Sequence, residues 1–158
     1  MNNQRLLTDY HLSNYVFPVT KNWLKGEKMP LMKLDMIKDS YSTDEITQIL
    51  EISYRVMLEA FEAPEGDRYQ IVTQHEIFEM QILDTGLGVN RTDKVIVFSL
   101  VTRPRTVEQK VNFYKELVSR LNENLGIRPE DIMINLTVNS DEDWSFFGGK
   151  AQFLTGDL

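Results

Sequence analysis

Pro30 is the residue with the most unusual chemical potential in this sequence, because it stands directly behind an internal methionine, Met29. An initiator methionine is readily removed before proline, and the new chain would then begin with a secondary amine. An α-amino group titrates near ~8, so such an amine can act as an acid or a base at neutral pH. If residues 1–28 stay attached, the same nitrogen is a tertiary amide without a proton. The sequence therefore predicts a catalytic Pro30 only in a chain that begins there.

The alternative is that Met29-Pro30 merely opens a strand where no ladder N–H is needed. The preceding residues 25–28 read Lys-Gly-Glu-Lys, which the codons AAA-GGA-GAA-AAA would encode. These codons would form a purine-rich bacterial ribosome-binding site in front of Met29. We therefore expect residues 1–28 to be an N-terminal extension that arises from a misassigned start, and the gene's own codons test this.

A pair of cations stands at Arg103-Pro104-Arg105. Proline biases the residue before it to an extended conformation, so arginines at i and i+2 can share one side and grip one anion. Two planar guanidinium forks suit a carboxylate better than lysines would. The pair predicts a carboxylate site, and a solvated pair with a salt bridge to Glu108 is the alternative.

Asp67 is a further candidate, although an aspartate after Pro-Glu-Gly most often serves a turn or caps a backbone N–H. His75 has the pattern of a half-buried strand residue. Three aromatic residues are typical of a core or an interface: Tyr69, Tyr114 and Trp144.

Composition limits the possible function classes. The chain has 158 residues, 42% of them hydrophobic, and no cysteine, which fits one domain without disulfides or thiolate chemistry. Its two histidines, His11 and His75, form no spaced ligand pair, so no metal site is expected. Residues 1–28 hold four of the 17 Lys+Arg and two of the 24 Asp+Glu, which leaves a side-chain charge of −9 for the remainder. This charge argues against nucleic acid. Without a long apolar run or a secretion signal, we expect no membrane partner and a cytoplasmic location.

The elements that must position these residues form two similar halves. In the first half, a strand is expected at 31–38, and Ser42 and Glu45 form a capping box for an amphipathic helix that ends at residues 62–66. A second strand is expected near 68–75. A short strand-like run follows at 80–83, and the glycine loop at 84–88 lacks the spacing of a phosphate-binding loop.

The second half repeats this order, with a strand at 95–102, a helix at 107–125 and a strand at 132–138. Thr106 and Gln109 offer another capping box, and Gly126 is a natural helix end. Two consecutive βαβ units predict an α/β (α+β) fold, in which a four-stranded mixed sheet carries two helices on one face.

The other face of that sheet must also be covered, and self-association is the economical solution. The tail from Trp144 is aromatic and interrupted by glycine, with no helical pattern. It either crosses to a neighbouring subunit or folds over its own.

Residues 30–158 resemble the tautomerase superfamily, and specifically its malonate semialdehyde decarboxylase group. The motifs that carry the resemblance are MPLMKLD at 29–35, DRYQ at 67–70, DTGLG at 84–88, RPR at 103–105 with EQK at 108–110, NSD at 139–141, DWSF at 143–146 and FLTGDL at 153–158. The resemblance implies duplicated βαβ chains that form homotrimers and use no cofactor.

The resemblance also implies roles for individual residues. Pro30 matches the catalytic proline, and Asp67 matches the aspartate that orients or activates water. Arg103 and Arg105 match the arginines that hold the substrate carboxylate. Trp144 and Phe146 are expected to contact the substrate. Residues 1–28 have no counterpart in that group, and Phe-Gly-Gly-Lys at 147–150 departs from its arginine-rich tail, so the substrate stays open.

The expected function is cofactor-independent decarboxylation of a small 3-oxo acid such as malonate semialdehyde. One alternative is a tautomerase or hydratase acting on small unsaturated or 2-oxo acids. Another is a non-catalytic trimeric binding protein, which applies if residues 1–28 are retained and Pro30 has no free amine.

Overall fold

The computed structural model describes residues 30–158, so the expectations for residues 1–28 lie outside the described residues. Its main elements are β1 (Leu31–Ile37), α1 (Thr43–Phe61), β2 (Tyr69–His75), β3 (Ile96–Thr102), α2 (Val107–Leu125) and β4 (Ile132–Val138). Three single turns of helix complete the list: η1 (Pro129–Asp131), η2 (Asp141–Asp143) and α3 (Gln152–Thr155).

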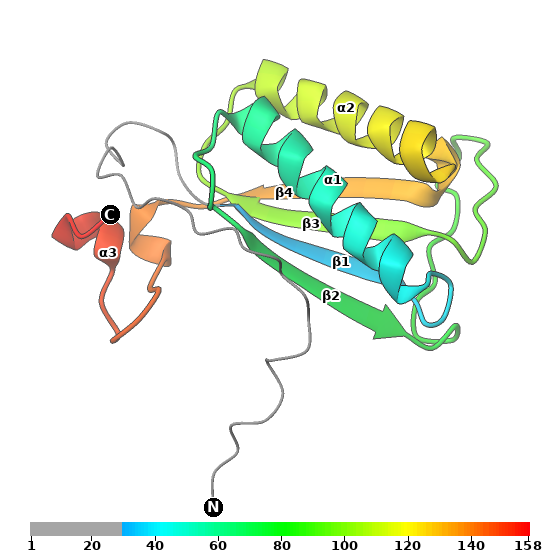
Figure 1. Ribbon diagram of the computed structural model, residues 1–158, viewed down its shortest axis with the longest axis horizontal. Helices are drawn as coiled ribbons and strands as arrows, with labels where there is room; N and C mark the ends of the chain where they lie inside the picture. The colour runs from blue at the N-terminus through cyan, green and yellow to red at the C-terminus, as the bar shows by residue number, and fades with distance from the viewer. Residues whose placement is uncertain (1–29) are drawn as a thin grey trace, which may run out of the picture.

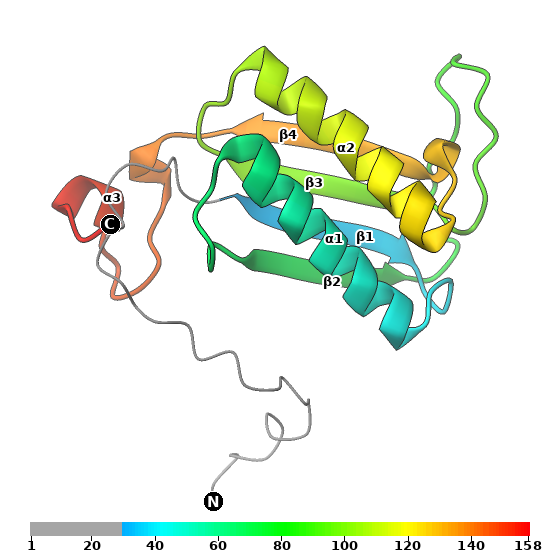
Figure 2. The same cartoon turned by 45° about the horizontal axis from the view of Figure 1, so that its top comes forward.

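The strands form one four-stranded sheet in the order β2-β1-β3-β4. β1 runs parallel to β2, β3 runs parallel to β4, and the two central strands are antiparallel to each other. Both long helices cover the same face of the sheet (Figures 1 and 2). The predicted pair of βαβ units in a mixed sheet is therefore confirmed.

Each long helix begins at the capping box that the sequence predicts. Ser42 accepts from the backbone N–H of Glu45 and Thr106 from that of Gln109, and each acceptor's own N–H is bonded in return. The residues that follow the helices are Glu62 after α1 and Gly126 after α2, and both are left-handed, with φ of 51° and 66°. A left-handed residue at this position ends the helix and turns the chain back toward the sheet.

The core lies between the sheet and the two helices. Alternate residues of β1 and β3 face the helices, which gives each strand a buried period of two. The largest fully buried side chains are Phe61, Phe98, Phe113, Met32, Leu34, Met36, Ile49, Met57, Ile96, Leu100, Leu117 and Leu121.

The opposite face of the sheet carries no helix of the described chain. Tyr69, Ile71 and Met133 on this face remain 44%, 47% and 38% exposed. His75 is half-buried here, as predicted, and its Nε2 lies 2.6 Å from the Asp35 carboxylate. The expectation that other subunits cover this face remains a prediction.

Two sequence predictions are wrong. Residues 80–83 form no strand, because a turn at Glu76–Glu79 carries the chain away from the edge strand β2 and leaves the run without a pairing partner. Its apolar side chains behave differently, since Met80 is buried whereas Leu83 is 79% exposed. The tail does contain one turn of helix, α3, which is closed by the Gly156 N–H.

The glycine loop is a turn, in which the Asp84 carboxylate accepts hydrogen bonds from the backbone N–H groups of Leu87 and Gly88.

Candidate active site

The direction of the strands brings the candidate residues to the same end of the sheet. β1 and β2 begin at the end of the sheet where β3 and β4 finish. Pro30 precedes β1, Asp67 precedes β2, Arg103 follows β3, and the tail follows β4. Figure 1 shows the tail and α3 beyond this end of the sheet.

Pro30 is buried at the start of the central strand β1. Its neighbour Leu31 pairs with Tyr69 on one side and with Val101 on the other. One residue earlier in this register, Pro30 lies between Arg68 and Thr102. Thr102 is fully buried and accepts a hydrogen bond from the Arg105 guanidinium, so the register places the proline at the same end of the sheet as Arg105.

Arg105 is only 7% exposed. Its Nε donates to the Thr102 hydroxyl at 3.1 Å, and its Nη1 donates to the Phe61 carbonyl at 3.1 Å. Phe61 is the last residue of α1, where a cation is favoured by the helix dipole. The guanidinium also lies over the Phe61 ring, 5.1 Å from its centroid. These contacts fix a buried positive charge between α1 and the end of β3.

Arg103 has other partners. Its Nε lies 2.7 Å from Asp141 Oδ1, and its Nη2 donates to Asp141 Oδ2 at 3.1 Å. The guanidinium lies over Phe153, 5.1 Å from the ring centroid. The partner is therefore Asp141 in η2, between β4 and the tail. It is not Glu108, which is exposed on the first turn of α2. The two arginines of the motif thus contact different parts of the chain.

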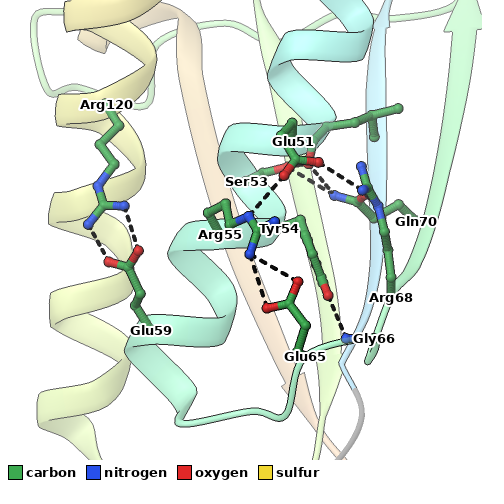
Figure 3. A network of polar contacts seen from close by, with 11 residues as sticks. Glu51, Ser53, Tyr54, Arg55, Glu59, Glu65, Gly66, Arg68, Gln70 and Arg120 are labelled. Atoms are coloured by element: carbon green, nitrogen blue, oxygen red, sulfur yellow. Dashed lines mark hydrogen bonds and ion pairs between the residues drawn. The ribbon is translucent and has the colours of Figure 1, made fainter. Parts of the chain in front are cut away.

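Asp67 is buried in the connection between α1 and β2. Its N–H donates to the Pro64 carbonyl, so Asp67 takes part in a turn, as is common for an aspartate after Pro-Glu-Gly. The same connection is tied to α1, because Gly66 N–H donates to the Tyr54 hydroxyl at 2.8 Å and Arg55 binds both Glu65 oxygens at 3.0 Å (Figure 3). These contacts hold the Asp67 backbone in place.

Aromatic residues of the tail form one wall of the site. Trp144 and Phe146 stack with their centroids 5.6 Å apart, and Phe146 also contacts Tyr69 at 6.1 Å. Phe153 meets Phe146 edge-on at 5.5 Å. The Trp144 Nε1–H donates to the Asn139 side chain. The tail therefore contacts its own subunit through Tyr69 and Arg103.

An open cavity of about 720 Å³ lies beside this wall. Its lining residues are Pro64, Gly66, Asp67, Tyr69, Phe146, Phe147, Lys150, Gln152, Asp157 and Leu158. Burial, and secondarily the negative charge of Asp67, raises the pKa of Tyr69. The Tyr69 hydroxyl therefore stays protonated at neutral pH and can donate a hydrogen bond.

Sequence reasoning missed three features of this site. Tyr69 has the pattern of a packing residue, and Lys150 was noted only as a departure from an arginine-rich tail. Asp141 stands in the NSD motif, but its ion pair with Arg103 was not predicted, because the pair joins residues that are 38 positions apart. Only the alternation of β2, which turns Tyr69 away from the core, could have marked one of them.

Residues 30–158 contain no group of three or more His, Asp or Glu side chains arranged to hold a metal ion. In the same part of the chain, neither long helix is apolar enough to cross a membrane.

Comparison with known proteins gives consistent matches. The profile of the family described as "Tautomerase enzyme" matches residues 67–147. The "Probable tautomerase YrdN" of Bacillus subtilis is 42% identical over 130 residues, which are 82% of this chain and 100% of the relative. A crystal structure of malonate semialdehyde decarboxylase is 44% identical with a TM-score of 0.76, over 81% of this chain and 98% of that one.

A fused 4-OT trimer is similar in fold alone, with 16% identity and a TM-score of 0.62, over 79% of this chain and 98% of that one. The resemblance to the malonate semialdehyde decarboxylase group is confirmed by the matches in sequence and in fold. This chain belongs to the tautomerase superfamily and is one of its enzymes.

Proposed function

We propose that this chain, in a form that begins at Pro30, is a cofactor-independent cytoplasmic decarboxylase of a small 3-oxo acid. The observation that carries the proposal is the 44% identity to malonate semialdehyde decarboxylase over 98% of that chain. The meeting of Pro30, Asp67, Arg103 and Arg105 at one end of the sheet supports it.

The length of a relative supports the start at Pro30. YrdN aligns over its full length with 130 residues of this chain. Residues 29–158 also number 130. Removal of Met29 from a chain of that length would expose the Pro30 amine. A protein that keeps residues 1–28 has an amide at this nitrogen, and we expect it to be a binding protein without activity.

The proposed mechanism uses charge to stabilise the transition state. Arg105 and Arg103 hold the carboxylate of the 3-oxo acid. As the bond to that carboxylate breaks, carbon dioxide leaves and the electron pair moves toward the 3-oxo group. The protonated Pro30 amine stabilises the enolate oxygen that develops there, and protonation of the enolate carbon gives the aldehyde or ketone.

A second route begins with a neutral Pro30 amine. The amine adds to the 3-oxo carbon, loses water and forms an iminium ion that accepts the electron pair released with carbon dioxide. Protonation of the resulting enamine and hydrolysis of the iminium ion then release the aldehyde or ketone and regenerate the amine. Borohydride distinguishes the routes, because only the iminium route leaves a reduced adduct on Pro30 that mass spectrometry can locate.

A tautomerase or hydratase activity is the second candidate. The relative YrdN carries the name tautomerase, and Asp67 lies in a cavity with the Tyr69 hydroxyl, which could together hold a water. We therefore propose assaying three reactions on one preparation that begins at Pro30. These are decarboxylation of a 3-oxo acid, ketonisation of phenylenolpyruvate and hydration of a 2-oxo-alkynoate. Decarboxylation should be fastest, and its absence with all 3-oxo acids would contradict the proposal.

We also propose that the enzyme is a homotrimer. The open face of the sheet exposes Tyr69, Ile71 and Met133, and relatives of this fold include trimers. Sedimentation of the chain that begins at Pro30 tests this, and a monomer at micromolar concentration would contradict it.

A further inference from the structure

We infer that Asp141 is a positioning residue, which sets the Arg103 guanidinium for the substrate carboxylate. This inference rests on the proposed function, because it concerns how the same site binds its substrate.

The Arg103–Asp141 contact is a two-point ion pair. Nε and Nη2 of Arg103 lie 2.7 Å and 3.1 Å from the two carboxylate oxygens, which fixes the rotation of the guanidinium plane. The side chains are 28% and 35% exposed, so water screens the pair only in part. Phe153 lies against the guanidinium and restricts it from a third direction.

This geometry leaves the other edge of the guanidinium for a ligand. A guanidinium has five N–H donors, and Asp141 takes one from Nε and one from Nη2. The Nη1 edge can then bind a second carboxylate in the same plane. Asp141 therefore does not compete with the substrate for the same donors; it holds the arginine in the orientation that the substrate needs.

Asp141 is itself held in place by the segment that follows β4. Asn139 N–H donates to the Thr102 carbonyl at 3.0 Å, which extends the sheet beyond β4. Asp143 caps the turn by accepting from Ser140 N–H at 2.8 Å and from its hydroxyl at 3.0 Å. The carboxylate that orients Arg103 is thus attached to the end of the same sheet as Arg103.

Arg105 shows why Arg103 needs such a partner. Arg105 is buried and bonded to Thr102 and Phe61, which belong to the core. Arg103 is half-exposed and has no such support from α1 among its described contacts. Without Asp141, Arg103 would have to be ordered by the substrate itself, and binding would weaken by the entropy of that ordering.

The test uses the chain that begins at Pro30 and compares Asp141→Asn with Glu142→Gln. Asp141→Asn keeps the size of the side chain and removes the charge that orients Arg103. Glu142→Gln removes the same charge from the exposed neighbouring residue. We expect Asp141→Asn to raise KM about tenfold, as expected for loss of a charged hydrogen bond, with a smaller change in kcat. Glu142→Gln should leave KM unchanged.

Two further measurements separate positioning from structure. In an Arg103→Ala background, Asp141→Asn should have no additional effect on KM, since its action passes through Arg103. Asp141→Glu, which keeps the charge, should recover part of the loss. An unchanged KM in Asp141→Asn, or an equal rise in Glu142→Gln, would overturn the inference.

Binding of malonate, an unreactive dicarboxylate, gives a readout that needs no turnover. Calorimetry should show weaker malonate binding to Asp141→Asn than to the unsubstituted chain. If no substrate is turned over but this difference is found, the proposed function fails and the inference stands. If malonate does not bind, or binds both equally, the inference fails.

Discussion

The two βαβ units have the same dimensions but contribute different parts of the site. Each consists of a strand of 7 residues, a helix of 19 and a second strand of 7. The first unit supplies Pro30 and Asp67, and the second supplies Arg103, Arg105 and the tail. The duplicated elements therefore build the scaffold, while the segments that precede and follow them carry the proposed site residues.

The two helices also differ in burial. α1 buries eight residues, whereas α2 buries three. Phe61, the last residue of α1, is one of these buried residues, and its carbonyl accepts a hydrogen bond from Arg105 of the second unit. We therefore predict that the first unit supplies the catalytic groups and that the second unit binds the substrate carboxylate, and the following substitutions test that division.

Arg105→Ala should have the largest effect. It removes the buried cation that we propose holds the substrate carboxylate and leaves the Phe61 carbonyl without this donor. We expect a loss of roughly 2–5 kcal/mol in transition-state stabilisation, the range for truncating one partner of a buried charge pair. The measurement is kcat/KM with a 3-oxo acid, together with thermal unfolding. Equal effects of Arg105→Ala and Arg103→Ala on unfolding would contradict the structural difference between them.

Asp67→Asn should lower kcat more than it raises KM. The substitution keeps the shape of the side chain in the turn but removes the charge that we propose orients or activates water. We expect a loss of about 100-fold in hydration, the lower end of the range for a positioned acid or base. Steady-state kinetics check this, and a rise in KM alone would show that Asp67 belongs to binding and not to chemistry.

The caps of the two units should contribute equally to stability. Ser42→Ala and Thr106→Ala each remove a side-chain acceptor from the first turn of a helix. We expect each substitution to lower the free energy of unfolding by about 1 kcal/mol without changing kcat. Denaturant unfolding measures this. A much larger loss from one cap would show that one unit dominates the folding of the other.

The smallest effect is expected from Glu59→Gln, which breaks an exposed ion pair between α1 and α2. Glu59 binds Arg120 at both oxygens (Figure 3). We expect a loss of less than ~1 kcal/mol, since water screens the pair. The Arg120 guanidinium lowers the pKa of Glu59, so the stabilisation should be present at neutral pH and disappear as the pH falls through that pKa. Unfolding at pH 7 and at low pH tests this, and a difference that persists in acid would contradict it.

Local patterns account for what the sequence could predict of the fold. Capping boxes at Ser42 and Thr106 and the period of the buried residues located both long helices and all four strands within about one residue. The run at 80–83 was wrong because apolar character alone cannot show whether a neighbouring strand is available. The α3 turn was missed because it is four residues long.

The site was harder to predict, because its contacts join distant parts of the chain. Arg103 and Arg105 look equivalent in sequence, yet one binds the tail and the other binds the end of α1. Such partners depend on where the strands end. The roles of Pro30, Asp67, Trp144 and Phe146 came from resemblance to a family and remain predictions.

The most direct test of the account compares two chains that differ only at the amino terminus. One begins at Pro30, and the other keeps residues 1–28, with both masses verified by mass spectrometry after the assay. We predict decarboxylation by the first chain and none above background by the second, whose Pro30 nitrogen is an amide. Pro30→Ala at the amino terminus should lose much less than the extension does, because alanine keeps a primary amine. Equal activity of the extended, unprocessed chain would contradict the central claim that the Pro30 amine is the catalytic group.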